Sequence, residues 1–202
     1  GAGDVNGDGK DDVIVGAPGA KVGFYANEGK AYVVFGKTSG TTVELSDFAA
    51  GTGGGFVMNG ETSDITGDFA GYSVSGAGDV NGDGKDDVVV GALRASSNGS
   101  YAGRGYVVFG KTTTTAVNLA NVTAGTGGFA MNGEAAFNNA GNSVSGAGDV
   151  NGDGKDDVVV GAKNAPTGSY AGRAYVVFGK SNGTAVELAA VAASNLGGFA
   201  MQ

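Results

Sequence analysis

The nonapeptide DVNGDGKDD occupies residues 4–12 and recurs without change at residues 79–87 and 149–157. Each copy carries four aspartates, so twelve of the twenty acidic residues of the chain lie in these three segments. Like charges held this close repel one another unless a positive charge gathers them. A fold and a function for this protein must therefore explain the three segments first.

Oxygen-bearing side chains alternate with other residues in each copy, in the pattern D-x-N-x-D-G-x-x-D. In the first copy the side-chain oxygens of Asp4, Asn6 and Asp8 converge if the chain curls around a point. The glycine at position six permits such a sharp turn, because glycine tolerates positive φ. Lys10 offers its backbone carbonyl, and Asp12 closes the shell at the start of the next strand.

This pattern begins like an EF-hand loop, which has oxygen ligands at positions one, three and five, glycine at six and a carbonyl at seven. It ends differently, with an aspartate at position nine that precedes a strand. A shell of hard oxygens favours Ca²⁺ over Zn²⁺, Cu²⁺ or Mg²⁺, and three Ca²⁺ ions would move the net charge from −8 to about −2. The ligands predicted for the three Ca²⁺ sites are Asp4, Asn6, Asp8, Lys10 and Asp12; Asp79, Asn81, Asp83, Lys85 and Asp87; and Asp149, Asn151, Asp153, Lys155 and Asp157.

A turn without a metal is the alternative interpretation of these segments, since Asp-Gly and Asn-Gly pairs also build hairpin turns. The occurrence of three identical copies favours the metal. Asp11, Asp86 and Asp156 occupy the eighth position of the pattern. We expect them to be solvated or to stabilise the turn rather than to bind the ion.

Other landmarks recur in step with the loops and define a repeat of about 70 residues. The approximate repeat boundaries are 1–59, 60–132 and 133–202, within a single domain. The sequence YVVFGK ends at Lys37, Lys111 and Lys180, and the sequence GGF ends at Phe56, Phe129 and Phe199. We expect the phenylalanines in the core and the lysines at solvated strand ends.

Short apolar runs between turn signals predict that each repeat consists of strands. The strands expected in the second repeat are residues 71–75, 87–92 and 105–110, and residues 116–122 and 128–132 are the segments expected to supply an outer strand. The run at residues 87–92 does not alternate with polar residues, which is typical of a strand buried on both faces. Four strands per repeat predict an all-β fold made of β-propeller blades.

Composition excludes several classes of protein. The 42 glycines occur with only two prolines and no three-residue period, which excludes collagen. The absence of histidine and cysteine argues against a zinc site, a disulfide and Ser-His-Asp hydrolysis. The acidic charge makes nucleic acid a poor partner, and no segment approaches the length of a membrane span. The chain begins with glycine and has no signal-peptide pattern, which predicts either a segment cut from a longer precursor or one that has lost its targeting region.

These residues resemble the FG-GAP repeats of the integrin α-subunit β-propeller and of related bacterial repeat proteins. The family pattern runs from phenylalanine, a small residue and glycine, through a strand, the acidic loop and a second strand, to Gly-Ala-Pro. Here FAG at residues 69–71 precedes the second loop and GAP at residues 16–18 follows the first. The third repeat departs from the pattern at Asn139, in the phenylalanine position, and Leu93 and Lys163 replace the proline.

The resemblance implies a propeller, usually of about seven blades, with Ca²⁺ in its loops, in an extracellular or cell-surface protein. We therefore expect a non-enzymatic calcium-binding scaffold or adhesion module with a protein or glycan ligand. The alternatives are a carbohydrate-binding module and a non-catalytic part of a secreted polysaccharide-acting enzyme. The residues considered for glycan contact are Tyr25, Tyr101 and Tyr170, with Arg104 or Arg173. Catalysis by the loop aspartates is disfavoured, because carboxylates committed to Ca²⁺ are poor proton shuttles.

Three repeats fall short of a closed propeller, which needs at least about four blades. The segment before the loop occurs only twice, at residues 60–75 and 133–145, so one entering strand is missing. Either further blades belong to a longer chain, or two chains of three blades combine into six. We expect the longer chain, because open end blades expose sheet edges and apolar faces.

Overall fold

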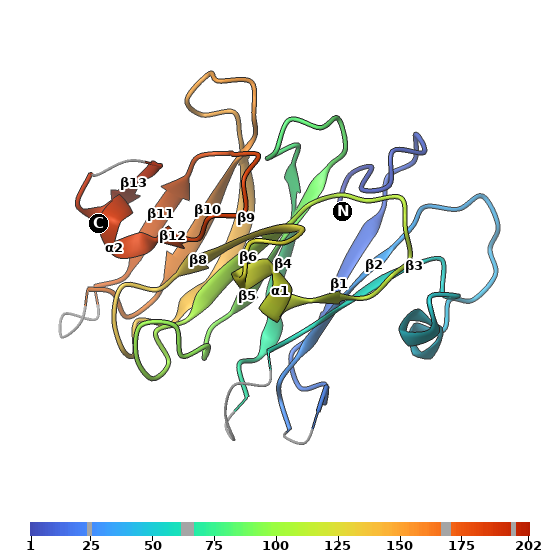
Figure 1. The fold of residues 1–202 in the computed structure, drawn as a ribbon, viewed down its shortest axis with the longest axis horizontal. Helices are drawn as coiled ribbons and strands as arrows, with labels where there is room; N and C mark the ends of the chain where they lie inside the picture. Colours follow the sequence, from blue (N-terminus) through green and yellow to red (C-terminus); the bar gives the residue numbers. More distant parts are fainter. Residues whose placement is uncertain (24–25, 62–66, 167–170, 195–196) are drawn as a thin grey trace.

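A computed structural model describes residues 1–23, 26–61, 67–166, 171–194 and 197–202. The strands form three sheets that stand side by side in chain order as a fan (Figure 1). The first sheet lies at one end of the fan and the third at the other, and the fan does not close into a ring. The predicted all-β fold of propeller blades is confirmed as a partial propeller.

Each repeat contributes most of one sheet, here called blades 1, 2 and 3. Blade 1 contains β1 (Val13–Ala17), β2 (Lys30–Val34) and β3 (Gly55–Asn59). Blade 2 contains β4 (Ala70–Gly78), β5 (Asp87–Ala92), β6 (Arg104–Val108) and β8 (Gly128–Asn132). Blade 3 contains β9 (Ala140–Gly148), β10 (Asp157–Ala162), β11 (Arg173–Val177) and β13 (Gly198–Met201). Successive strands within a blade pair antiparallel, and the four main strands predicted for the second repeat are confirmed.

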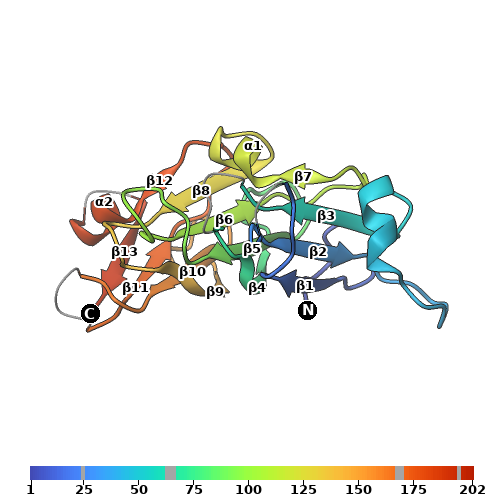
Figure 2. The ribbon, with the colours of Figure 1, turned by 90° about the horizontal axis from the view of Figure 1, so that it is seen from below.

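Two short strands cross from one repeat to the preceding blade. β7 (Val117–Asn118) pairs in parallel with β3, and β12 (Val186–Glu187) pairs in parallel with β8 (Figure 2). The prediction that residues 116–122 form an outer strand of their own blade is therefore wrong. Only two residues of each segment pair with the outer edge of the preceding blade, and the chain then turns into a helix.

The helices that follow these strands are short. They are α1 (Leu119–Thr123), α2 (Leu188–Ala192) and, in the first repeat, the 3₁₀ helix η1 (Leu45–Ala50). Leu119 and Val122 of α1 are buried, so this turn closes the outer end of the core. No helix within the described residues is long and apolar enough to cross a membrane.

The core lies between the blades. Val88 and Val90 of β5 are fully buried in one cluster with Phe56 and Met58 of blade 1. Val89, on the opposite face of β5, is buried in a second cluster with residues of blade 3. Every residue of β5 is thus buried, because blades cover both of its faces, which explains its continuous apolar sequence.

Adjacent blades approach each other closely at paired glycines. A Cβ on Gly91 would lie 2.1 Å from the carbonyl oxygen of Gly141, and a Cβ on Gly16 would lie 2.1 Å from that of Gly71. The glycine one residue before the end of β5 or β1 therefore meets the second residue of the first strand of the next blade, which is also a glycine. Only a residue without a side chain allows this separation.

Substitution of Gly91 by alanine is expected to destabilise the protein by about 1–3 kcal/mol, because the blades must move apart. Gly161 is the matched control, since it holds the same place in blade 3. A Cβ there would meet mainly the Ser143 hydroxyl, at 2.3 Å, which can rotate away. Urea unfolding measures both variants, and equal losses for Gly91→Ala and Gly161→Ala would contradict the blade contact.

Candidate metal-binding loops

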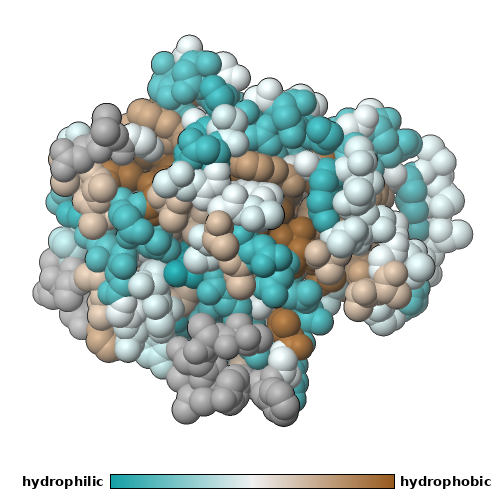
Figure 3. Space-filling view, in the orientation of Figure 1, coloured by the Kyte–Doolittle hydropathy of each residue, from teal (hydrophilic) through white to brown (hydrophobic). Residues whose placement is uncertain are grey.

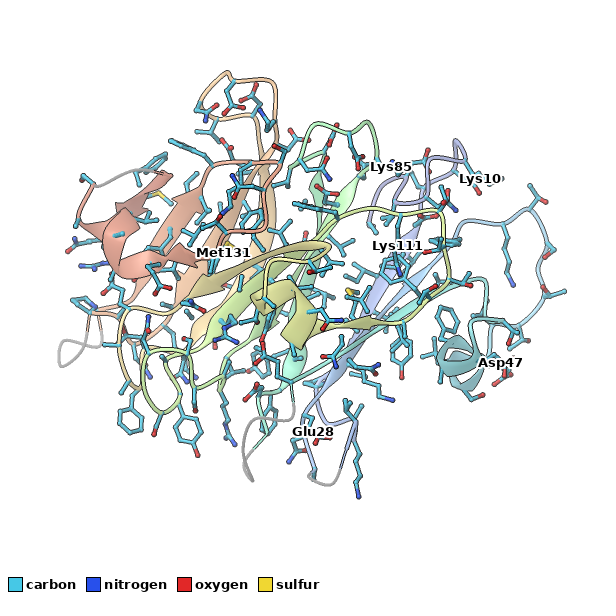
Figure 4. The ribbon with its side chains drawn as sticks, viewed as in Figure 1. Lys10, Glu28, Asp47, Lys85, Lys111 and Met131 are labelled. Atoms are coloured by element: carbon cyan, nitrogen blue, oxygen red, sulfur yellow. The ribbon has the colours of Figure 1, made fainter. Side chains whose placement is uncertain are left out.

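The three nonapeptides project from the same edge of the fan, at the top of Figure 1. The second connects β4 to β5, the third connects β9 to β10, and the first leads into β1. Lys10 and Lys85 lie in adjacent loops at this edge (Figure 4). The fold thus brings together, along one edge, three acidic segments that are far apart in the sequence.

Each loop curls around the carboxylate of its first aspartate. In the second loop Asp79 accepts hydrogen bonds from the N–H groups of Gly82 at 2.7 Å, Asp83 at 3.0 Å and Gly84 at 2.8 Å. Asp149 receives the same three bonds in the third loop. The predicted curl is therefore present, and glycines with positive φ at its fourth and sixth positions make it possible.

The closing aspartate is buried under each loop. The two carboxylate oxygens of Asp87 accept from the N–H of Val80 at 2.9 Å and from the N–H of Gly110 at 2.7 Å. Asp87 is fully buried, and Asp12 and Asp157 are at most 1% exposed. The same pair of bonds recurs for Asp12 with Val5 and Gly36, and for Asp157 with Val150 and Gly179. This residue joins the loop to the hairpin that follows it.

Negative charge gathers around the closing aspartate. Burial raises the pKa of Asp87 to about 7, and the charges of Asp79 and Asp83 add to the rise, although hydrogen bonds from backbone N–H groups oppose it. The pKa of Asp12 is raised by burial in the same way. Among the described residues no lysine or arginine forms an ion pair with Asp87. Its carboxylate is thus buried beside like charges without a cationic partner.

The oxygen atoms of the loop side chains are ligands that suit a hard cation, but these side chains do not surround a common point. No group of three or more acidic side chains in the described residues is arranged to hold a metal. The amide nitrogen of Asn81 donates to Asp83 at 3.3 Å, and the Lys85 ammonium lies 3.3 Å from the other carboxylate oxygen of Asp83. Both carboxylate oxygens of Asp83 therefore already have a partner, one an amide N–H and the other an ammonium group.

The aspartate at the eighth position links neighbouring loops. The carboxylate of Asp86 accepts from the N–H of Asp4 at 2.7 Å, and that of Asp156 accepts from the N–H of Asp79 at 2.9 Å. For these two residues the expectation of a solvated or turn-stabilising role is wrong. Asp11 is exposed. Blade stacking creates the contact, so the pattern of a single loop cannot reveal it.

A buried ion pair recurs at the blade boundaries. The guanidinium of Arg104 donates to Glu61 at 2.7 Å, and their side chains are only 11% and 15% exposed. The Tyr106 hydroxyl and the Thr123 hydroxyl also donate to this carboxylate. Arg173 and Glu134 form the second pair at 2.5 Å. The two arginines therefore form ion pairs at the blade boundaries, and the recurring NGE and R-x-Y segments were the sequence signal that could have found them.

Two of the lysines expected to be solvated instead contact aromatic rings across a blade boundary. The ammonium groups of Lys111 and Lys180 each lie 4.4 Å from a ring centroid, that of Phe56 and that of Phe129 respectively. Burial lowers the pKa of both lysines. Phe56 and Phe129 are fully buried, as predicted, whereas Phe199 is 39% exposed.

One of the three tyrosines considered for glycan contact lies in the described part of the chain, and Tyr25 and Tyr170 fall outside it. The Tyr101 ring meets that of Phe137 edge to face at 5.9 Å, and the guanidinium of Arg94 lies 5.6 Å from the Tyr101 centroid. Phe137 is 57% exposed. These residues form a small aromatic surface patch.

The comparisons with known proteins agree with this architecture. The model of the FG-GAP repeat family matches residues 1–34, 70–108 and 140–177, which together make up more than half of the chain. No curated protein matches the sequence of this chain. The matched segments contain all three acidic loops, the strand that follows each loop and the paired glycines at the blade boundaries. The chain belongs to the FG-GAP repeat family.

Proposed function

We propose that this chain is a non-catalytic, Ca²⁺-binding propeller module of an extracellular or cell-surface protein, and that it serves as a scaffold or adhesion module. The observation that carries the proposal is the buried Asp87 carboxylate, which lies beside Asp79 and Asp83 without a cationic partner in the described residues. A cation in the loop offsets this repulsion. The chemistry of the ligands, all oxygens, favours Ca²⁺.

In each loop the ion would be held by side-chain oxygens and one backbone carbonyl. For the second loop these are the side chains of Asp79, Asn81, Asp83 and Asp87 and the carbonyl of Lys85. A bound Ca²⁺ supplies two positive charges and several bonds to a segment that the unfolded chain leaves extended. Binding is therefore coupled to folding, and each ion stabilises the folded conformation of its loop.

Titration calorimetry of the metal-free protein tests the sites directly. We expect three Ca²⁺ ions per chain, and we expect two for Asp83→Ala because that variant removes one carboxylate of the second loop. Asp47→Ala is the charge control. Asp47 is an exposed residue of η1 outside the loops (Figure 4). If no Ca²⁺ binds at millimolar Ca²⁺ concentration, the proposal is wrong.

The pH dependence of stability gives a second test, made in chelator. The folded protein holds a proton on Asp87 up to about pH 7, whereas an unfolded aspartate loses it near pH 4. The contribution of this residue to stability is therefore largest below about pH 4 and declines as pH rises toward 7, by a few kcal/mol at most. Urea unfolding of the wild type should show this decline relative to Asp87→Asn, and identical pH profiles would contradict it.

Carbohydrate binding is the second candidate function, and the aromatic patch of Tyr101, Phe137 and Arg94 supports it. Exposed rings beside a cation can contact the faces and hydroxyl groups of a sugar. A glycan array tests this candidate, with Phe137→Ala as the variant. Signal that survives this substitution would exclude the patch as the binding surface.

A further inference from the structure

Neighbouring acidic loops are joined by a reciprocal pair of hydrogen bonds at the aspartate in the eighth position. The carboxylate of Asp86 accepts from the N–H of Asp4 at 2.7 Å, and the N–H of Asp86 donates to the carbonyl oxygen of Asp4 at 3.1 Å. Asp156 forms the same two bonds with Asp79, at 2.9 Å and 3.1 Å. The pair of bonds thus occurs at both boundaries between blades, and each time the partner is the first aspartate of the preceding loop.

The loops pack closely where these hydrogen bonds form. A Cβ on Gly3 would lie 2.0 Å from the Asp86 carboxylate, and a Cβ on Gly78 would lie 2.0 Å from that of Asp156. The surface of this edge of the fan is hydrophilic (Figure 3). Both carboxylates are nevertheless half-buried, because each turns toward the neighbouring loop. The contact is therefore built into the fold at both boundaries.

This contact connects the ligand sets proposed for two loops. Asp86 lies in the chain between Lys85 and Asp87, which are both proposed ligands of the second loop. Its side chain holds the backbone of Asp4, the first proposed ligand of the first loop. The carboxylate of Asp4 in turn accepts from the N–H of Gly9 at 2.8 Å and so maintains the curl of that loop. A path of covalent and hydrogen bonds thus leads from the ligands of one loop to the centre of the next.

We propose that Asp86 and Asp156 are positioning residues for metal binding in the loop that precedes each of them. The inference rests on the proposed Ca²⁺ sites and adds a coupling between them. Ca²⁺ in the second loop fixes Asp86 through the ligands on either side of it, and Asp86 then fixes Asp4. Filling one loop therefore reduces the ordering that the adjacent loop needs, so adjacent loops bind Ca²⁺ with positive cooperativity.

Electrostatic repulsion opposes this coupling. Each loop carries four aspartates and one lysine, so a bound Ca²⁺ changes its charge from −3 to −1 and weakens its attraction for an ion in the next loop. Salt at about 0.15 M screens exposed charges that lie more than about 8 Å apart. The link between loops is a direct hydrogen bond of 2.7 Å, which salt does not screen in this way. We therefore expect the link to dominate at physiological ionic strength.

NMR titration with calcium measures each loop separately. The N–H groups of Gly9, Gly84 and Gly154 each donate to the first aspartate of their own loop, so each amide signal reports one site. A chelator sets the free Ca²⁺ concentration. Asp86→Ala is expected to raise the dissociation constant of the first loop at least about tenfold, because loss of a group that orients a metal ligand typically weakens binding by about 10–100-fold. The second loop should change less.

Two variants separate positioning from a simple loss of charge. Asp156→Ala makes the same change at the next boundary, and it should weaken the second loop and not the first. Asp86→Asn removes the charge, but its amide oxygen can still accept from the N–H of Asp4, so the first loop should bind more tightly than in Asp86→Ala. If Asp86→Ala weakens only its own loop, or if Asp86→Asn is no better than Asp86→Ala, the proposal is overturned.

A double-mutant cycle measures the coupling. Asp83→Ala removes a ligand of the second loop and should also weaken Ca²⁺ binding in the first loop. In the Asp86→Ala background the same substitution should have no further effect on the first loop, and an equal effect in both backgrounds would overturn the coupling. These outcomes are distinct from failure of the proposed function, in which the wild type binds no Ca²⁺ at any loop.

The link itself can be tested in chelator, without any metal. Exchange of the Asp4 amide proton with water, followed by NMR, is expected to be at least about tenfold faster in Asp86→Ala, because the amide loses a hydrogen bond to a charged group. The Asp79 amide is the control in the same spectrum, because it binds Asp156 and should not change. Unchanged exchange at Asp4 would overturn the proposal whether or not the loops bind Ca²⁺.

Discussion

Adding calcium to the chelator-treated protein is expected to raise its melting temperature by roughly 15–30 °C. A ligand at about 100 times its dissociation constant stabilises the folded state by about 2.7 kcal/mol per site, and three sites are proposed. For a chain of about 200 residues each kcal/mol shifts the melting temperature by about 2–4 °C. The physical reason is that each curled loop binds the ion and the unfolded chain does not.

Differential scanning calorimetry measures this shift. Magnesium at equal ionic strength is the control, because its strict octahedral geometry suits the loop less well and the general screening of charge is the same. The shift should be larger with calcium than with magnesium. Equal melting temperatures in calcium and in chelator would show that the loops fold as metal-free turns.

Removal of one partner from a buried blade-boundary ion pair is expected to cost about 3–5 kcal/mol. Arg104→Met leaves the Glu61 carboxylate 15% exposed and without the guanidinium that now lies 2.7 Å away. The two hydroxyl donors, Tyr106 and Thr123, remain but carry no charge. Guanidinium chloride unfolding measures the loss.

Two controls identify the source of that loss. The double variant Glu61→Leu/Arg104→Met removes both charges and should recover most of the stability, because an apolar pair can replace a buried ion pair at little cost. Lys30 holds the position of Arg104 in the first repeat and forms no ion pair within the described residues. Lys30→Met should therefore change stability by less than about 1 kcal/mol. A loss as large as that of Arg104→Met would point to packing rather than to charge.

Features that depend on neighbouring residues in the sequence were predictable. The repeat of about 70 residues, the strands β5 and β8 and the curl of each loop follow from local patterns, because turn residues and apolar runs act over a few positions. In the pattern D-x-N-x-D-G-x-x-D the glycines allow the backbone to curl, and the spacing of the acidic residues then places their carboxylates in one loop. The metal that we assign to this curl remains a prediction from the chemistry of its oxygens.

Features that depend on one blade touching the next were not predictable. Asp86 and Lys111 are charged residues next to apolar strands in the sequence, and nothing local to them predicts that each contacts the preceding blade. Residues 116–122 have the composition of a strand, but only two of them pair, because the edge they reach belongs to another repeat. The sequence by itself determined the repeats, the strands and the acidic loops, which arise from contacts of short range along the chain. Only the tertiary structure decided which charged groups meet across the blade boundaries, because those contacts depend on how separate blades stack.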